Sequence, residues 1–201
     1  MIKTLQKEFN YFTSLLPVEF QEEFKKNAYI CGGAIYCLHN NKEPVDYDFF
    51  CRDVDFTDRI KEYFKSYTTP FKNLLQGKHD NMVLLITKYA ISLGKYQIVT
   101  KYVGEPELVV SQFDFKHNCY WYDPKYENIN QLYGWGYLNS NKLIFNDDRV
   151  RDISGTIMRI PKFVSRGMTI TKKEIAKMLS KLEDNGFDES EHEILHDYTS
   201  Y

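Results

Sequence analysis

Two aspartates separated by one residue, Asp46 and Asp48, are the side chains best suited to chemistry in this sequence. Residues two apart on a strand point to the same side, so the two carboxylates would lie side by side. Carboxylates held this close repel each other unless a cation lies between them. Mg²⁺ is often bound by one or two carboxylates together with substrate phosphates, so the pair predicts a site for Mg²⁺ (or Mn²⁺).

A glycine pair, Gly32 and Gly33, precedes these aspartates by a gap of twelve residues. Two glycines after a buried strand allow a tight turn and leave backbone N–H groups open to a ligand. If a helix begins there, its unpaired N–H groups attract anions such as a triphosphate. A phosphate-binding turn beside a metal-binding strand suits nucleotidyl transfer, in which two ions activate the attacking hydroxyl and neutralise the leaving pyrophosphate. The alternative is an unrelated turn and a surface Asp-x-Asp.

The elements that must position these residues are indicated by hydrophobic spacing and by helix breakers. Apolar residues at helical spacing predict a helix over 3–26 with a break at Pro17. The next stretch predicts a buried strand, a glycine turn, a short helix and a second strand, in the order AYIC, GG, AIYCLHNN and VDYDFFCRD. Those two strands would bring the glycine turn beside the aspartates.

The rest of the chain predicts a mixed architecture followed by helices. A helix (FTDRIKEYFKSY), two strands around the turn Gly94-Lys95, a short helix (GEPELVVSQF) and strands at FDFKH, NCYWYD and KLIF are expected. A capping box at Thr171 and Glu174 opens a last helix. The fold class is therefore α+β, a small mixed sheet flanked by helices. We expect a core over 1–146, a helical segment over 147–186 packed on it, and an acidic tail over 187–201.

The opening motif resembles the signature of the DNA polymerase beta-like nucleotidyltransferase superfamily. Cys31-Gly32-Gly33, the gap, and Asp46-Tyr47-Asp48-Phe49 fill every position of that signature. The Gly-Gly form is most similar to the head domains of poly(A) polymerases and CCA-adding enzymes, and the stretch IMRIPKFVSRGM (157–168) resembles the helical segment that follows them. The resemblance implies a nucleotidyltransferase fold and NTP-dependent transfer of a nucleoside monophosphate.

The family also supplies a third carboxylate from a later strand, and Asp114 in VVSQFDFKH is the candidate. With Asp46 and Asp48 it would bind the metal and act in catalysis, while Gly32 and Gly33 would hold the nucleotide. Asp123 competes for the third place, although Asp-Pro is more typical of a turn. Arg159 and Lys162 are three apart and can share a helix face as nucleotide contacts; the alternative for them is an ordinary basic helix face.

Two departures from the family pattern narrow the interpretation. CCA-adding enzymes usually place an Arg-Asp pair soon after the glycines, whereas this chain has the uncharged AIYC. Little chain follows residue 168, so we expect a minimal nucleotidyltransferase of the kind found in phage genomes or toxin–antitoxin systems. The acceptor would be an RNA 3′ end (of tRNA or another RNA), a protein side chain or a small molecule, and the basic segment 151–177 slightly favours RNA. The alternative is a non-catalytic nucleotide- or partner-binding module on the same fold, such as an antitoxin-like or inhibitor protein.

Composition limits the remaining classes of protein. The 201-residue chain has a formal net charge of −2, which does not mark a general nucleic-acid binder, although residues 151–177 carry seven Lys/Arg against two carboxylates. Four cysteines without a C-x-x-C pair indicate free thiols in a reducing compartment. The N-terminal stretch MIKTLQKEFNYF lacks a long apolar run, so we expect no signal peptide, no membrane span and a cytoplasmic location.

Overall fold

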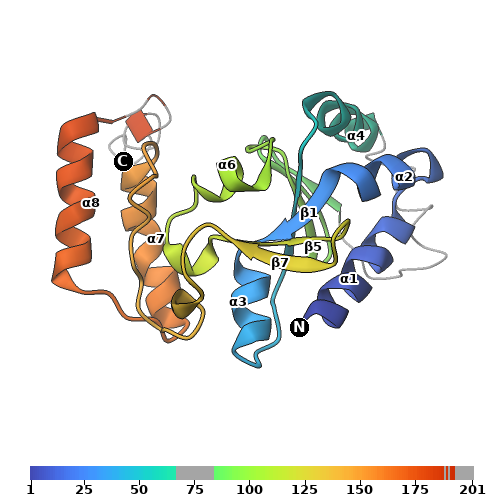
Figure 1. Cartoon of the computed structure of the whole chain (residues 1–201). Helices are drawn as coiled ribbons and strands as arrows, with labels where there is room; N and C mark the ends of the chain where they lie inside the picture. The colour runs from blue at the N-terminus through green and yellow to red at the C-terminus, as the bar shows by residue number, and fades with distance from the viewer. Residues whose placement is uncertain (67–83, 188, 190, 193–201) are drawn as a thin grey trace. The chain divides into compact units, whose positions relative to one another are not determined.

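The computed structural model describes residues 1–66, 84–187, 189, 191 and 192 (Figure 1). The chain forms two compact units that interleave along the sequence. The first unit comprises Met1–Val110 and Tyr120–Leu132, and the second comprises Ser111–Cys119 and Tyr133–Tyr201. The division expected at residue 146 stays a prediction.

A seven-stranded mixed sheet forms the centre of the first unit, in the order β3-β4-β5-β2-β1-β6-β7. Its strands are β1 (Ala28–Cys31), β2 (Tyr47–Cys51), β3 (Leu84–Ile86), β4 (Ala90–Leu93), β5 (Tyr96–Val99), β6 (Tyr120–Asp123) and β7 (Asn128–Gln131). β2 and β5 are parallel, whereas the other neighbouring pairs are antiparallel. The expected α+β class with a mixed sheet is confirmed, as is the hairpin at Gly94-Lys95 between β4 and β5.

A helix breaker and a side-chain cap set two of the helix boundaries in the first unit. The described helices are α1 (Ile2–Leu15), α2 (Val18–Asn27), α3 (Gly33–His39), α4 (Val54–Ser66) and α6 (Pro106–Val110). Pro17 separates α1 from α2, as expected, because its ring disfavours helical geometry in the preceding residue. The carboxylate of Asp53 accepts a hydrogen bond of 2.7 Å from Phe56 N and caps α4.

Aromatic side chains join α1 and α2 to one face of the sheet. The ring of Phe12 lies 4.5 Å from Phe49 on β2 and 5.1 Å from Tyr96 on β5, measured between ring centroids. Phe9 and Phe24 complete the cluster, and all five residues are buried. Successive strand residues point to opposite faces, so the side chain of Asp48 lies on the face opposite Phe49. The core therefore fixes which face of β2 can carry the predicted site.

Two short 3₁₀ turns and two helices are the fully described elements of the second unit. These are η1 (Lys116–Asn118), η2 (Trp135–Tyr137), α7 (Ile153–Ser165) and α8 (Lys172–Asn185). Half of the expected capping box is present, because Thr171 Oγ1 accepts a hydrogen bond from Glu174 N at 3.3 Å. The carboxylate of Glu174 instead accepts a hydrogen bond from the buried Phe145 N at 2.8 Å. Glu174 thus ties α8 to an inner segment of its own unit.

The strands predicted from apolar alternation at FDFKH and KLIF are wrong. At FDFKH the backbone pairs only briefly, through Lys116 N to Ile144 O at 2.9 Å and Asn146 N to Asp114 O at 3.0 Å, and then turns into η1. Its partner KLIF likewise forms only isolated bridges. β7, with the polar sequence NINQ, was not expected, because an edge strand needs no apolar alternation. Most of the tail expected over 187–201 lies outside the described residues.

Candidate functional site

The glycine turn joins β1 directly to α3 in the first unit. Gly32 has φ 81° and ψ −133°, a conformation that side chains with a Cβ rarely adopt, and its N–H donates a hydrogen bond to Tyr120 O at 3.1 Å. Gly33 is the first residue of α3, and a Cβ placed on it would have no atom within 4 Å. The two glycines therefore differ: Gly32 is required by the turn, whereas Gly33 leaves open space above it.

The two aspartates lie next to this turn. Asp48 on β2 is the register partner of Cys31, the last residue of β1 before Gly32. Asp46 precedes β2 and is exposed, and Asp48 is half-buried. The short α3 and its return loop thus bring the glycine turn beside Asp48 as the sequence predicts, whereas Asp46 lies just before the strand on which both aspartates were expected. These two carboxylates fit the oxygen chemistry that Mg²⁺ prefers, and the Mg²⁺ (or Mn²⁺) site stays a prediction.

Asp114 lies in the second unit, within a cluster of charged side chains. The guanidinium of Arg159 binds it in a fork, with Nε donating to Oδ2 at 2.7 Å and Nη2 donating to Oδ1 at 2.8 Å. Thr156 Oγ1 donates to Oδ1 at 2.8 Å, and Arg149 Nε lies 3.4 Å from the same oxygen. A forked arginine–carboxylate pair is among the stronger charge-assisted contacts in proteins. Asp114 is thus neutralised by two arginines from its own unit.

Asp152 completes this arginine–aspartate cluster. Its Oδ2 accepts from Arg149 Nη2 at 2.8 Å and from Arg159 Nη2 at 2.9 Å, so each arginine contacts both aspartates. Asp152 precedes α7 with a left-handed backbone, φ 53°. Gly155 is needed beside it, because a Cβ at that position would lie 2.0 Å from Asp152 Oδ1. The cluster therefore depends on the local shape of the start of α7.

The electrostatics of the cluster favour the charged form of Asp114. Burial by itself would raise the pKa of this carboxyl, because only 14% of its side chain is exposed. The hydrogen bonds and charge of Arg159, with the charge of Arg149 and the Thr156 hydroxyl, outweigh burial and hold the pKa below its usual range. The same contacts raise the pKa of Arg159 despite its own burial. Both groups are therefore ionised at neutral pH.

Sequence reasoning missed three members of this cluster: Arg149, Asp152 and Thr156. A signal was present, since Asp152, Thr156 and Arg159 recur at helical spacing within an otherwise apolar stripe of α7. Arg149 is 4% exposed at its side chain and donates a hydrogen bond to Gln112 O. An arginine this buried needs carboxylate partners. In this structure the cluster is therefore an ion network with a structural role.

The predicted site residues are thus divided between the two units. Gly32, Gly33, Asp46 and Asp48 lie in the first, and Asp114, Arg159 and Lys162 lie in the second. Within the described residues, no group of three or more His, Cys, Asp or Glu side chains is placed to hold a metal ion. Lys162 is exposed on α7. The metal-binding role of Asp114 and the nucleotide-binding roles of Arg159 and Lys162 stay predictions.

Comparison with protein families shows where the chain belongs. The family model described as Gabija anti-defense 2 family protein matches residues 4–156, which include the glycine turn, the Asp-x-Asp strand and Asp114. The chain belongs to the Gabija anti-defense 2 family. A curated relative, Gabija anti-defense 2 of Bacillus phage SPbetaL7, is 28% identical over 177 residues. That alignment covers 87% of this chain and 42% of the relative, so the chain spans less than half of the relative's length.

Solved structures show the fold of this family member. The Bacillus stearothermophilus CCA-adding enzyme in complex with CTP matches 81% of this chain and 43% of its own, with a TM-score of 0.52 and 18% identity. A tRNA-processing enzyme in an apo form matches 84% of this chain and 48% of its own, with a TM-score of 0.51 and 15% identity. The chain therefore has a nucleotidyltransferase-like fold, as its resemblance implies.

Family membership corrects the function expected from the sequence. Nucleotidyl transfer to an acceptor hydroxyl was the main prediction, and a match to an anti-defense family over most of the chain overturns it. The same finding favours the alternative, a partner-binding or inhibitor protein on this fold. No helix in the described part of the chain is long and apolar enough to cross a membrane.

Proposed function

We propose that this chain acts against Gabija defence as a non-catalytic inhibitor that binds a protein of that system. The observation that carries the proposal is the family match over residues 4–156, which spans the glycine turn and all three predicted catalytic carboxylates. A nucleotidyltransferase-like fold does not by itself imply transfer chemistry, because function depends on the site and not on the fold. Inhibition by binding needs only a complementary surface on a stable scaffold.

The arginine–aspartate cluster supports this proposal. A third metal ligand needs free carboxylate oxygens, whereas both oxygens of Asp114 accept hydrogen bonds from Arg159. Releasing Asp114 to a metal would leave Arg149, which is 4% exposed, short of a partner charge. AIYC after the glycine pair also provides no charged side chain beside the turn. These contacts favour a scaffold role for residues that an enzyme of this fold would use in chemistry.

The test compares catalytic-site variants in a protection assay. Host cells that carry the Gabija system would express the wild-type chain or the variant Asp46→Ala/Asp48→Ala and be infected with a phage that the system restricts. We expect both proteins to restore plaque formation to the same level, within roughly threefold, because inhibition by binding does not require the two carboxylates. The matched control is Asp55→Ala/Asp58→Ala, which removes the same charge from exposed positions of α4.

A second measurement examines binding directly. The purified chain should form a complex with proteins of the Gabija system, by size-exclusion chromatography, in EDTA and without any NTP. Loss of protection by a folded Asp46→Ala/Asp48→Ala variant, with the control still active, contradicts the proposal. Binding that requires Mg²⁺ and NTP contradicts it as well.

A further inference from the structure

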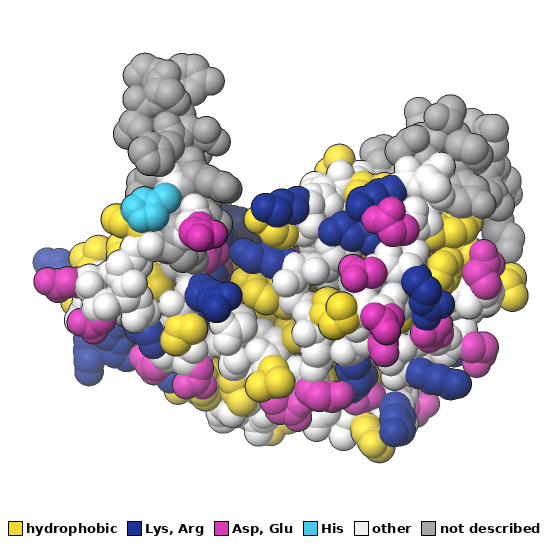
Figure 2. Space-filling view, turned by 90° about the horizontal axis from the view of Figure 1, so that it is seen from above, with side chains coloured by type: hydrophobic (Ala, Val, Ile, Leu, Met, Phe, Trp, Pro, Cys, Tyr) yellow, Lys and Arg dark blue, Asp and Glu magenta, His cyan; other side chains and the backbone are white. Residues whose placement is uncertain are grey.

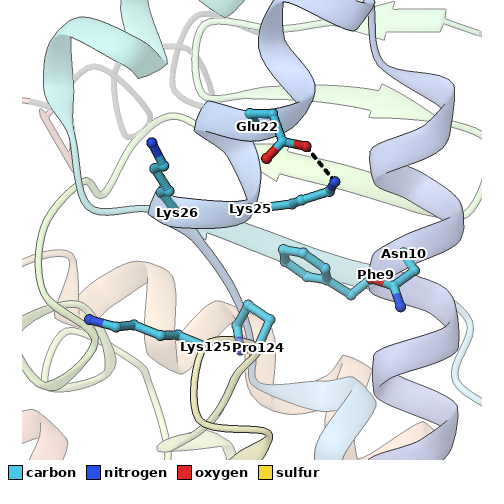
Figure 3. A pocket seen from close by; sticks show the side chains of 7 residues that line it. All are labelled: Phe9, Asn10, Glu22, Lys25, Lys26, Pro124 and Lys125. Atoms are coloured by element: carbon cyan, nitrogen blue, oxygen red, sulfur yellow. Dashed lines mark hydrogen bonds and ion pairs between the residues drawn. The ribbon is translucent and has the colours of Figure 1, made fainter.

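Two neighbouring clefts in the first unit share a pair of lysines, Lys26 and Lys125. The first cleft, of about 370 Å³, lies between α1, α2 and the turn after β6, with Phe9 and Pro124 among its lining residues (Figure 3). The second, of about 410 Å³, is lined in part by Trp121, Tyr126 and Asn130. Lys26 and Lys125 therefore lie where the two clefts meet.

Neither of these two lysines forms a salt bridge within the described part of the chain, although the charge of Lys26 acts on the nearby carboxylate of Glu22. Lys25 beside them is held by Glu22 at 2.6 Å, and Figure 3 shows Lys26 and Lys125 extending away from that ion pair. In the second cleft Arg52 is also neutralised, by Asp123 at 2.6 Å and Glu105 at 3.2 Å. The Lys125 ammonium lies 5.1 Å from the ring centroid of Tyr126, and no salt bridge of Lys26 or Lys125 is seen. The shared rim of the clefts thus carries two ammonium groups that no salt bridge holds among the described residues.

β7 provides an open sheet edge along the second cleft. Among the described strands it pairs with β6 alone, and its backbone forms no hydrogen bond to other described backbone groups. Asn128 and Asn130 are two apart on β7, and Asn130 is the register partner of Trp121, so these side chains face the same cleft. An unpaired edge of this kind accepts a further strand through its free N–H and C=O groups.

This surface extends along the sheet from the strand row of Cys31, where Trp121 and Asn130 lie, to the opposite end of β1. Asp48 is the register partner of Cys31 at one end of β1, whereas Ala28 at the other end pairs with Cys51. Arg52 N donates to Asn27 O at 3.0 Å just beyond that second end, next to Lys26. A four-residue strand spans on the order of 10 Å, so Lys26 lies about that far along β1 from the row of Asp48. Trp121 and Asn130 of the second cleft lie in that row, on the same face of the sheet as Asp48.

The charges around the clefts select an extended protein segment over a nucleic acid. Four carboxylates lie among the cations of the clefts, and all but Glu107 are held in ion pairs with Lys25 or Arg52: Glu22, Glu105, Glu107 and Asp123. A surface of mixed charge suits a nucleic acid poorly, because its backbone carries a charge at every nucleotide. The face drawn in Figure 2 likewise carries Lys and Arg side chains interspersed with Asp and Glu. A peptide places its carboxylates singly and adds apolar side chains, which fit beside Phe9, Pro124 and Trp121.

We propose that an extended, acidic segment of a partner protein docks here, pairing with β7 as an added strand and placing carboxylates at Lys26 and Lys125. The identity of that partner, the protein that this chain inhibits, rests on the proposed function. The docking surface itself does not depend on the proposed function. Main-chain pairing would supply affinity, and the side chains that alternate toward the second cleft would supply specificity.

The test uses the complete chain and a defined probe. A short fluorescein-labelled peptide that alternates valine and threonine with glutamate would be titrated with the wild-type chain by fluorescence anisotropy. Lys26→Glu/Lys125→Glu should weaken binding by at least about tenfold, because close charge pairs become repulsive. The matched control is Lys172→Glu/Lys173→Glu, the same charge change at exposed positions of α8, which should stay within about twofold. A peptide with proline at alternate positions should not bind, because it cannot pair along β7.

Other results of these titrations would contradict the docking surface. Absence of binding by the wild-type chain, equal loss in both lysine variants, or equal binding of the proline peptide overturns the docking surface. So does a single-stranded RNA that binds more tightly than the peptide and depends on Lys26 and Lys125. The same variants in the plaque assay separate the two proposals. Peptide binding without protection by the wild-type chain removes the proposed function alone, and protection that persists in Lys26→Glu/Lys125→Glu removes the docking surface alone.

Discussion

Asp114 shows how a residue that resembles a metal ligand can serve packing and charge balance. Its carboxylate joins three side chains of α7 and the preceding loop, from Arg149, Thr156 and Arg159. The resemblance to nucleotidyltransferases implies a third catalytic carboxylate, and Asp114 was the candidate because it follows a helix in an aromatic stretch. The structure gives it two guanidinium partners that sequence spacing alone does not reveal.

Replacing Asp114 tests this structural role. Asp114→Asn should lower the free energy of unfolding at pH 7 by roughly 2 to 3 kcal/mol, less than for a fully buried pair because Arg159 is 37% exposed. Asp147→Asn is the control, since Asp147 pairs with Lys116 at an exposed position and should change the value by under about 1 kcal/mol. Urea unfolding measures both. Equal effects of the two substitutions would contradict a special role for Asp114.

The difference in the free energy of unfolding between the wild type and Asp114→Asn should depend on pH, because the pKa of Asp114 is lowered in the folded state. The unfolded chain binds a proton more readily than the folded one, so the stabilisation is fully present above the ordinary aspartate pKa. It is lost as the pH falls from that ordinary value through the lower folded value. Wild-type and Asp114→Asn stabilities should therefore converge in strong acid. A gap that stays constant down to that range would contradict the ion network as its source.

At the scale of elements, the turn between β1 and α3 separates the roles of the two glycines. Gly32 has a backbone conformation that only glycine adopts readily, whereas Gly33 has helical surroundings and open space at its Cβ position. Both were assigned to nucleotide binding from sequence. The structure gives Gly32 a role in shaping the turn that exists without any ligand.

Alanine substitution distinguishes these roles. Gly32→Ala should destabilise the protein by roughly 1 to 3 kcal/mol through backbone strain. Gly33→Ala should stabilise it by roughly 0.5 kcal/mol, because alanine reduces the freedom of the unfolded chain and fits the helix. Thermal unfolding measures both, and the plaque assay should show full protection with Gly33→Ala. A stable Gly33→Ala protein that no longer protects would indicate that a ligand approaches the bare turn.

At the scale of the whole molecule, the chain passes three times between its compact units. Residues 111–119 belong to the second unit, but both of their ends continue directly into elements of the first, α6 and β6. The second unit therefore cannot unfold without removing a segment held at each end by the sheet unit. This connectivity favours one cooperative transition over two.

One tryptophan in each unit allows this to be measured. Trp121 is buried on β6 in the first unit, and Trp135 begins η2 in the second. Trp121→Phe and Trp135→Phe each leave one tryptophan, whose fluorescence reports the unfolding of its own unit. When Phe49→Leu is added to either variant, we expect the unfolding midpoint to shift by the same amount. That substitution removes aromatic contacts in the first unit and should lower the free energy of unfolding by roughly 1 to 2 kcal/mol. A shift confined to Trp121 fluorescence would show that the units unfold separately.

The sequence by itself determined the local elements whose signals are short-range. The break at Pro17, the glycine turn, the strand of Asp48 and the hairpin at Gly94-Lys95 were all predicted, because backbone restriction and hydrophobic alternation act over a few residues. The same motif also indicated the nucleotidyltransferase-like fold. β7 was not predicted, and the stretch around Phe115 was predicted as a strand although it forms only an isolated bridge. Pairing at a sheet edge, or through only two hydrogen bonds, leaves little signal in the pattern of apolar and polar residues.

Tertiary structure decided the partners of each charged side chain. Asp114 meets Arg149 and Arg159 from more than thirty positions away along the chain, and the two shared lysines of the clefts come from α2 and the turn after β6. Electrostatic effects depend on distance and burial in the folded chain, which residue type and spacing do not specify. The sequence therefore determined where carboxylates and glycines lie along the chain. Folding determined which charges are neutralised and which remain available to a partner.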